Sequence, residues 1–175
     1  LFLSQGGYFK KIIPQSLRMS SEQKLKEGDA VAQAVEATNR AELLFFTDRC
    51  QVYKARACDF EDTKASVLGD YLPAKLGMDE GENVRYMAVT DAYDGYMLFF
   101  FENGRVAKVE MAAYQTKTRR KKLLSAYSDP SPLCQAFYLR EEGEFLVTSS
   151  GGRVLLVHSG AISPKTTRDT QGVQV

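Results

Sequence analysis

Residues 45–54 have the sequence FFTDRCQVYK, and this stretch decides the fold. The apolar pair at its start predicts one β-strand, and the alternating residues at its end predict a returning strand. Asp48 and Arg49 lie between them, where a tight turn needs backbone with positive φ. We therefore interpret the stretch as a β-hairpin.

The same pattern occurs three more times along the chain. The further copies are FLSQGGYFK at residues 2–10, FFFENGRVAK at 99–108 and LVTSSGGRVLL at 146–156. Two of them carry typical turn pairs, Asn103-Gly104 and Gly151-Gly152. The chain is therefore predicted to contain four hairpins in a repeat.

The spacing of the hairpins predicts the architecture. Aligning Tyr8, Val52, Val106 and Val154 gives intervals of 44, 54 and 48 residues. Intervals of about 40–50 residues are typical of one four-stranded propeller-type blade, and helical repeats are shorter. We predict an all-β, propeller-like array of four-stranded blades. About three and a half repeats are present, as an incomplete or open ring.

The whole chain, residues 1–175, is predicted to be one repeat domain. Its approximate blades are residues 1–44, 45–98, 99–145 and a partial blade at 146–175. Further strands are expected at 84–90, at 135–139 and at 30–37. The last of these has enough alanine to be read as a helix, but Val31, Gln33 and Val35 alternate with small residues, which favours a strand.

Composition excludes several classes of protein. The formal charge of +1 excludes a histone-like protein but not a local basic stripe. No apolar run approaches the roughly 20 residues that a membrane helix needs, and the first residues do not resemble a signal peptide. Three cysteines without a C-x-x-C pair, together with the single His158, predict no metal site and no catalytic constellation. We expect no cofactor, no enzymatic activity and a cytoplasmic location.

In these motifs the chain resembles the C-terminal β-pinwheel domain of the A subunit of bacterial DNA gyrase and topoisomerase IV. Three segments carry the resemblance: GYFKK at 7–11 followed by Pro14 and Arg18, LFFTDR with VYK at 44–54, and ISP with RDTQGV at 162–173. Gyrase also has a glycine-rich basic box in one blade. Residues 16–28 are basic here but lack those glycines, which favours a topoisomerase IV-like role over strong wrapping.

The resemblance implies a function. Domains of this family hold duplex DNA along a basic rim and bend it, assisting an ATP-dependent change of DNA topology. It also implies partners, namely duplex DNA, the remainder of the A subunit, and the ATPase B subunit. ATP and Mg²⁺ would belong to other domains of a parent topoisomerase, an isomerase located in the bacterial cytoplasm at the nucleoid. Cleavage and ATP hydrolysis are not expected of this chain.

The densest basic run is the first candidate for DNA binding. Residues 117–122 read KTRRKK and follow the third hairpin, at a place equivalent to 166–171 after the fourth. Each cation of such a loop can neutralise a phosphate, although a charge run can also be a solvated loop. The candidates are Lys117, Arg119, Arg120, Lys121 and Lys122.

The hairpins and the motif-bearing segments supply the other candidates. Lys10, Lys54 and Lys108 recur at one place of the hairpin, which suggests a shared face. They could equally be edge lysines that discourage strand pairing. Arg105 and Arg153 lie beside turn glycines. The remaining candidates are Lys11, Arg18, Lys165 and Arg168.

No base-reading motif is visible, so binding is expected to follow the phosphate backbone and the flexibility of the duplex, without sequence specificity. Two alternatives stay open. The chain could be a propeller-type platform that docks proteins. It could also be a regulatory module with no DNA contact of its own.

Overall fold

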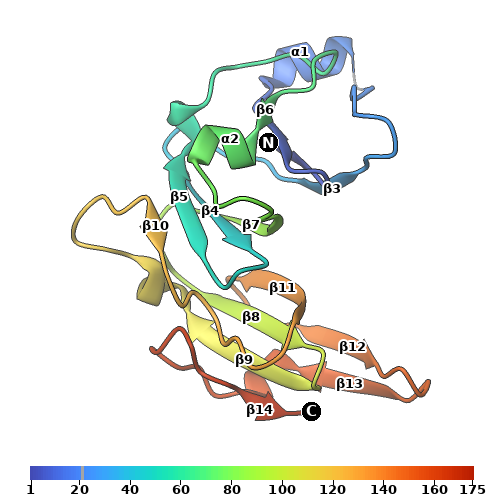
Figure 1. Ribbon diagram of the computed structural model, residues 1–175, viewed down its shortest axis with the longest axis vertical. Helices are drawn as coiled ribbons and strands as arrows, with labels where there is room; N and C mark the ends of the chain where they lie inside the picture. The colour runs from blue at the N-terminus through green and yellow to red at the C-terminus, as the bar shows by residue number, and fades with distance from the viewer. Residues whose placement is uncertain (21) are drawn as a thin grey trace. The chain divides into compact units, whose positions relative to one another are not determined.

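The computed structural model describes residues 1–20 and 22–175 (Figure 1). The chain forms two compact units. One contains Leu1–Arg49 and Tyr53–Asp91, and the other contains Cys50–Val52 and Ala92–Val175. Each unit is built around antiparallel sheets, as the repeated hairpins predict.

The first sheet begins at the N-terminus, in the first unit. Its order is β3-β1-β2-β6, formed by β1 (Phe2–Ser4), β2 (Tyr8–Lys10), β3 (Val31–Ala34) and β6 (Asp70–Tyr71). The second sheet has the order β10-β5-β4-β7, formed by β4 (Glu42–Thr47), β5 (Val52–Arg56), β7 (Val84–Thr90) and β10 (Lys122–Leu123).

The third sheet and the fourth hairpin belong to the second unit. The sheet has the order β11-β8-β9-β14, formed by β8 (Tyr96–Phe101), β9 (Arg105–Glu110), β11 (Leu133–Leu139) and β14 (Val173–Gln174). The fourth hairpin pairs β12 (Glu144–Thr148) with β13 (Val154–His158) and forms a two-stranded sheet. This agrees with three repeats and part of a fourth.

Each of two complete sheets borrows a strand from further along the chain. In the first sheet β2 pairs with β6, which follows the second hairpin, and Tyr8 opposes Tyr71. In the third sheet β9 pairs with β14, which follows the fourth hairpin, and Val173 opposes Val106. Neighbouring repeats are therefore interlocked and not merely stacked.

Glycine allows these borrowed strands to approach. Gly69 and Gly172 precede β6 and β14 and have φ of +87° and +73°. A Cβ on Gly172 would lie 2.1 Å from the Val106 carbonyl oxygen. Only glycine adopts this backbone at so short a distance without strain.

Short helices connect the strands. The α-helices are α1 (Pro14–Met19) and α2 (Leu72–Leu76), and the 3-10 helices are η1 (Ala57–Asp59), η2 (Met111–Tyr114) and η3 (Ser159–Ala161). The sequence pattern does not predict α1 and α2, because five or six residues are too few to show a helical period. Each of η1, η2 and η3 directly follows the second strand of a hairpin.

Aromatic residues of the hairpins form the core. In the first unit the ring of Phe9 packs against Phe45 and Phe60, with centroids 5.8 Å and 4.4 Å away. In the second unit Phe99 stacks on Tyr127 at 5.2 Å. Burial of such large apolar rings is a major driving force for folding.

The expected elements agree closely with the structure, with one correction. The strand predicted at 84–90 is β7, the one at 135–139 is the main part of β11, and β3 lies within 30–37. In the second hairpin, positive φ is predicted at Asp48 and Arg49, but it occurs at Cys50, with φ of 54°. Cys50 occupies the place that Gly104 and Gly152 have in the later hairpins.

Candidate nucleic-acid interface

The loop between η2 and β10, residues 115–121, carries the densest charge of the chain, and we call it the basic loop (Figure 1, amber). Its four cations are Lys117, Arg119, Arg120 and Lys121, and all four are exposed. Across the described residues, none of them has an ion-pair partner. Lys122 is half-buried at the start of β10.

The sequence around the basic loop contains no acidic residue that could neutralise its charge. The nearest acidic residues along the chain are Glu110 and Asp129, so residues 111–128 contain no carboxylate. Four cations and no anion give residues 115–121 a charge of +4. Exposed cations close together repel one another and attract phosphate, and dissolved salt screens both effects.

Hydrogen bonds shape the loop. The Thr116 hydroxyl donates to the Thr118 carbonyl at 2.6 Å, and the Arg120 N–H donates to the same oxygen at 2.7 Å. Below the loop, the Tyr114 hydroxyl donates to the Ala126 carbonyl at 2.7 Å. Tyr114 is fully buried, and burial raises the pKa of its phenol. The two ends of the loop are thus tied together.

Two predicted residues of the following repeat contact the segments that flank this loop. The Lys165 N–H donates to the Lys108 carbonyl at 2.9 Å and its own carbonyl accepts from Glu110, so Lys165 lies against β9 just before η2. Its side chain is exposed. The guanidinium of Arg168 is half-buried and donates to the carbonyls of Ala113 and Leu124 at 3.2 and 3.5 Å.

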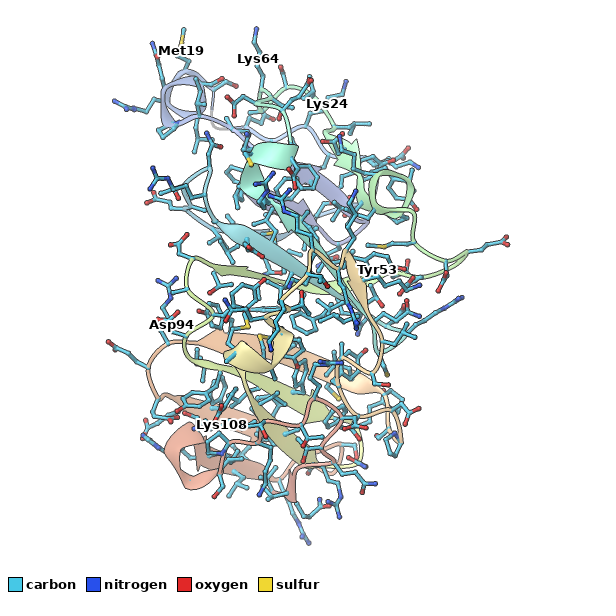
Figure 2. All side chains as sticks on the ribbon, turned by 90° about the vertical axis from the view of Figure 1, so that its left-hand side faces the viewer. Met19, Lys24, Tyr53, Lys64, Asp94 and Lys108 are labelled. Atoms are coloured by element: carbon cyan, nitrogen blue, oxygen red, sulfur yellow. The ribbon has the colours of Figure 1, made fainter. Side chains whose placement is uncertain are left out.

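Burial corrects the prediction for Lys10 and Lys108, which are only 3% and 2% exposed. The Lys10 ammonium donates to the carbonyls of Lys24 and Ala65 at 3.0 and 3.1 Å, and burial lowers its pKa. The Lys108 ammonium donates to Glu142 at 2.5 Å and lies 4.4 Å from the Tyr96 ring centroid (Figure 2). Cations held in this way cannot reach a phosphate.

Three further candidates are engaged within the protein. Lys11 forms an ion pair with Asp62 at 3.2 Å. Arg105 donates to the carbonyl of Gly172 at 3.0 Å, which fastens β14 to β9. Lys54 is half-buried, and burial lowers its pKa. The side chains of Lys11 and Arg105 thus join neighbouring repeats.

Two further candidates are exposed. Arg153 belongs to the turn between β12 and β13, which lies on the opposite side of the second unit from the basic loop (Figure 1). Arg18 is on α1, in the first unit, next to Met19, which projects outward (Figure 2). The basic stretch at 16–28 includes this helix, and its residue 21 lies outside the described part of the chain.

Metal-binding and membrane-spanning features have no counterpart in the described residues. Apart from residue 21, which is not described, the chain contains no group of His, Cys, Asp and Glu suited to hold a metal ion. Over the same residues, neither α-helix has the length and apolar character of a membrane span. Cys58 and Cys134 are exposed, and Cys50 is partly buried.

Comparison with known proteins agrees with the fold. No family model matches the chain. The C-terminal domain of DNA topoisomerase IV superposes with a TM-score of 0.82 at 20% identity, over 99% of this chain and 55% of that one. The C-terminal domain of E. coli ParC gives 0.70 at 16% identity, covering 99% and 70%. That of DNA gyrase A gives 0.62 at 15% identity, covering 99% and 58%.

Similar sequences come from DNA gyrase. The gyrase A protein of Mycoplasma pneumoniae is 22% identical over 137 residues, which are 78% of this chain and 16% of that protein. The chloroplastic and mitochondrial gyrase A protein of Arabidopsis thaliana is 27% identical over 121 residues, 64% of this chain and 13% of that protein. The chain thus spans less than a fifth of these relatives. It has the β-pinwheel fold of the C-terminal domains of topoisomerase IV and DNA gyrase A, and it resembles gyrase A proteins in sequence.

Proposed function

We propose that this chain binds duplex DNA without sequence specificity and bends it, as the C-terminal domain of the A subunit of a type IIA topoisomerase. The observation that carries the proposal is the basic loop, in which four exposed cations lack any carboxylate partner in the described structure. Within residues 1–20 and 22–175, the ion pairs of Lys11, Arg56, Lys75, Lys108 and Arg140 leave these four cations unpaired.

Uncompensated cations suit a phosphate backbone. Each lysine or arginine that neutralises a phosphate releases condensed counterions, which makes binding favourable and dependent on salt. The exposed Lys165 side chain, whose backbone pairs with Lys108 and Glu110 at the end of β9, adds a further cation in the same unit. The described residues offer no long helix that could enter the major groove, since α1 and α2 have six and five residues. Contacts to phosphates therefore fit this surface better than reading of base edges.

Bending and the wider role rest on the resemblance to gyrase and topoisomerase IV. In this proposal the partners are the remainder of the A subunit, which carries out cleavage, and the B subunit, which hydrolyses ATP. The chain itself contributes DNA binding and bending.

The test compares the protein with a variant in which Lys117, Arg119, Arg120 and Lys121 are replaced by alanine. Fluorescence anisotropy with a short mixed-sequence duplex, measured over a range of salt, gives the slope of log K against log salt. We expect this slope to become shallower by about 3 to 4 in the variant, at about 0.9 per contact. A duplex labelled at both ends should show increased energy transfer when the unmodified protein bends it.

A negative result identifies the alternatives. Absence of binding at low salt, or binding that salt does not affect, would exclude the proposed DNA contact. It would support a module that docks proteins or regulates a parent enzyme. An unchanged slope in the quadruple variant would place the DNA surface elsewhere, and Arg18 and Arg153 would be the next candidates.

A further inference from the structure

We infer that Arg168 is a positioning residue for the basic loop, and this inference rests on the proposed function. The sequence motif that contains it, RDTQGV at 168–173, suggests a phosphate ligand. The structure assigns it a different part. One guanidinium nitrogen donates to the carbonyl of Ala113 and the other to the carbonyl of Leu124.

These two carbonyls stand on opposite sides of the basic loop. Ala113 lies in η2, just before the loop, and Leu124 follows β10, just after it. Arg168 comes from another repeat, 44 residues beyond Leu124. The planar guanidinium therefore connects the two sides of the loop at its base. The hydrogen bond from the Tyr114 hydroxyl to the Ala126 carbonyl does the same.

The bridge leaves one guanidinium nitrogen of Arg168 without an acceptor in the described structure. Backbone carbonyls at the base of the loop accept from the two other nitrogens, whereas this Nε is buried. A buried donor without an acceptor lowers the stability of the folded protein, so the Nε of Arg168 at this position destabilises the fold. A loop of four mutually repelling cations needs such a constraint, because repulsion favours open conformations over the one that presents all four together.

Lysine cannot replace this bridge. Its ammonium is a single point of charge on a flexible stem, whereas the arginine fork reaches two acceptors at fixed geometry. Arg168→Lys thus separates the two possible roles. If Arg168 contacts phosphate directly, lysine preserves the contact. If Arg168 holds the loop, lysine fails nearly as badly as alanine.

The experiment uses Arg168→Lys and Arg168→Ala, with Lys165→Ala as the matched control from the same segment. The first readout is limited trypsin digestion, in which mass spectrometry follows cleavage after Lys117, Arg119, Arg120 and Lys121 only. Cleavage reports local opening of the loop and does not depend on DNA. We expect cleavage to be several-fold faster in both Arg168 variants and unchanged in Lys165→Ala.

The second readout is the salt slope of DNA binding, measured at a temperature where thermal unfolding shows each variant to be folded. Loss of one phosphate contact makes the slope shallower by about 0.9, as expected for Lys165→Ala. Both Arg168 variants should lose clearly more than one contact, since the loop no longer presents its cations together.

The outcomes are distinct. Unchanged cleavage would overturn the positioning role whatever the DNA result, and so would recovery of the slope by lysine. Failure of the unmodified protein to bind DNA would remove the proposed function, while faster cleavage of the loop would still establish that Arg168 orders it.

Discussion

Two loops with the same place in their repeats have opposite charge. The acidic loop, residues 61–69, connects η1 to β6, and the basic loop connects η2 to β10. The acidic loop contains Glu61, Asp62 and Lys64, a net charge of −1, against +4 for the basic loop. Asp62 is paired with Lys11, and Lys64 projects outward (Figure 2). The repeat therefore determines the position of the loop between a 3-10 helix and the next strand. The residues of the loop determine its charge.

The two loops also end differently. The acidic loop ends at Gly69, whose φ of +87° brings the chain against the carbonyl of Phe9. The basic loop ends at Lys121, just before β10 begins, and Arg168 ties its base. A glycine holds the end of the acidic loop close to Phe9, and a side chain from the next repeat holds the base of the basic loop.

Charge reversal gives the largest expected effect. Arg119→Glu together with Arg120→Glu should weaken binding of a short duplex by about 100-fold at about 0.1 M salt, from two lost contacts plus repulsion of phosphate. Anisotropy titration measures the affinity. Lys64→Glu in the acidic loop is the control, and we expect it to change the affinity little. Equal losses of affinity for both sets of variants would mean that binding depends on the total charge of the protein and not on the basic loop.

Substitution of the anchoring glycine comes next. Gly69→Ala places a Cβ 2.3 Å from the Phe9 carbonyl oxygen at positive φ. It should lower the free energy of unfolding by about 2 to 3 kcal/mol, combining left-handed strain with displacement of β6. Denaturant unfolding measures the loss. Gly143→Ala, where an added Cβ meets nothing within 4 Å, should be nearly neutral. A tolerated Gly69→Ala would show that β6 does not need this close approach.

The buried Lys108 distinguishes structural cations from binding cations within one unit. Lys108→Ala should cost about 2 kcal/mol of stability, because it leaves Glu142 and the Ser159 carbonyl without their shared donor. The salt slope of DNA binding should not change, in contrast to the basic loop. Thermal unfolding and anisotropy together make the test, and a shallower slope would restore Lys108 as a phosphate contact.

Titration of Glu142 gives the smallest effect. Hydrogen bonds from Lys108 and Ser159 hold the pKa of Glu142 below its ordinary 4.5. A carboxylate with a lowered folded-state pKa stabilises the protein above pH 4.5, and this contribution disappears as the pH falls through the folded-state pKa. The Glu142 side chain is 38% exposed, so we expect only a few tenths of a kcal/mol.

Unfolding followed between about pH 6 and 3, compared with Glu142→Gln, isolates this contribution. The difference in stability between the two proteins should shrink on acidification. A difference in stability that stays constant with pH would show that Lys108 and Glu142 do not form a stabilising ion pair. Lys108 would then differ less from the cations of the basic loop.

Residues of the hairpins show what local sequence can predict. Turn residues and alternating apolar positions depend on neighbours within roughly ten residues, so β4, β8 and β9 were predictable from pattern alone. The strand predicted at 84–90 coincides with β7. Borrowed strands β6 and β14 have two residues each and pair with strands far away in sequence, so no local period indicated them.

The sequence by itself determined the four hairpins, their repeat and the basic run at 117–122, because turn geometry, side-chain alternation and charge are local properties. Which cations are buried and which are exposed depends on contacts between segments that are distant in sequence. Lys10 and Lys108 face inward to carbonyl and carboxylate acceptors, Arg168 bridges the base of a loop, and the four cations of the basic loop stay exposed. Burial and hydrogen bonding depend on residues brought together across repeats, which identical local motifs cannot specify.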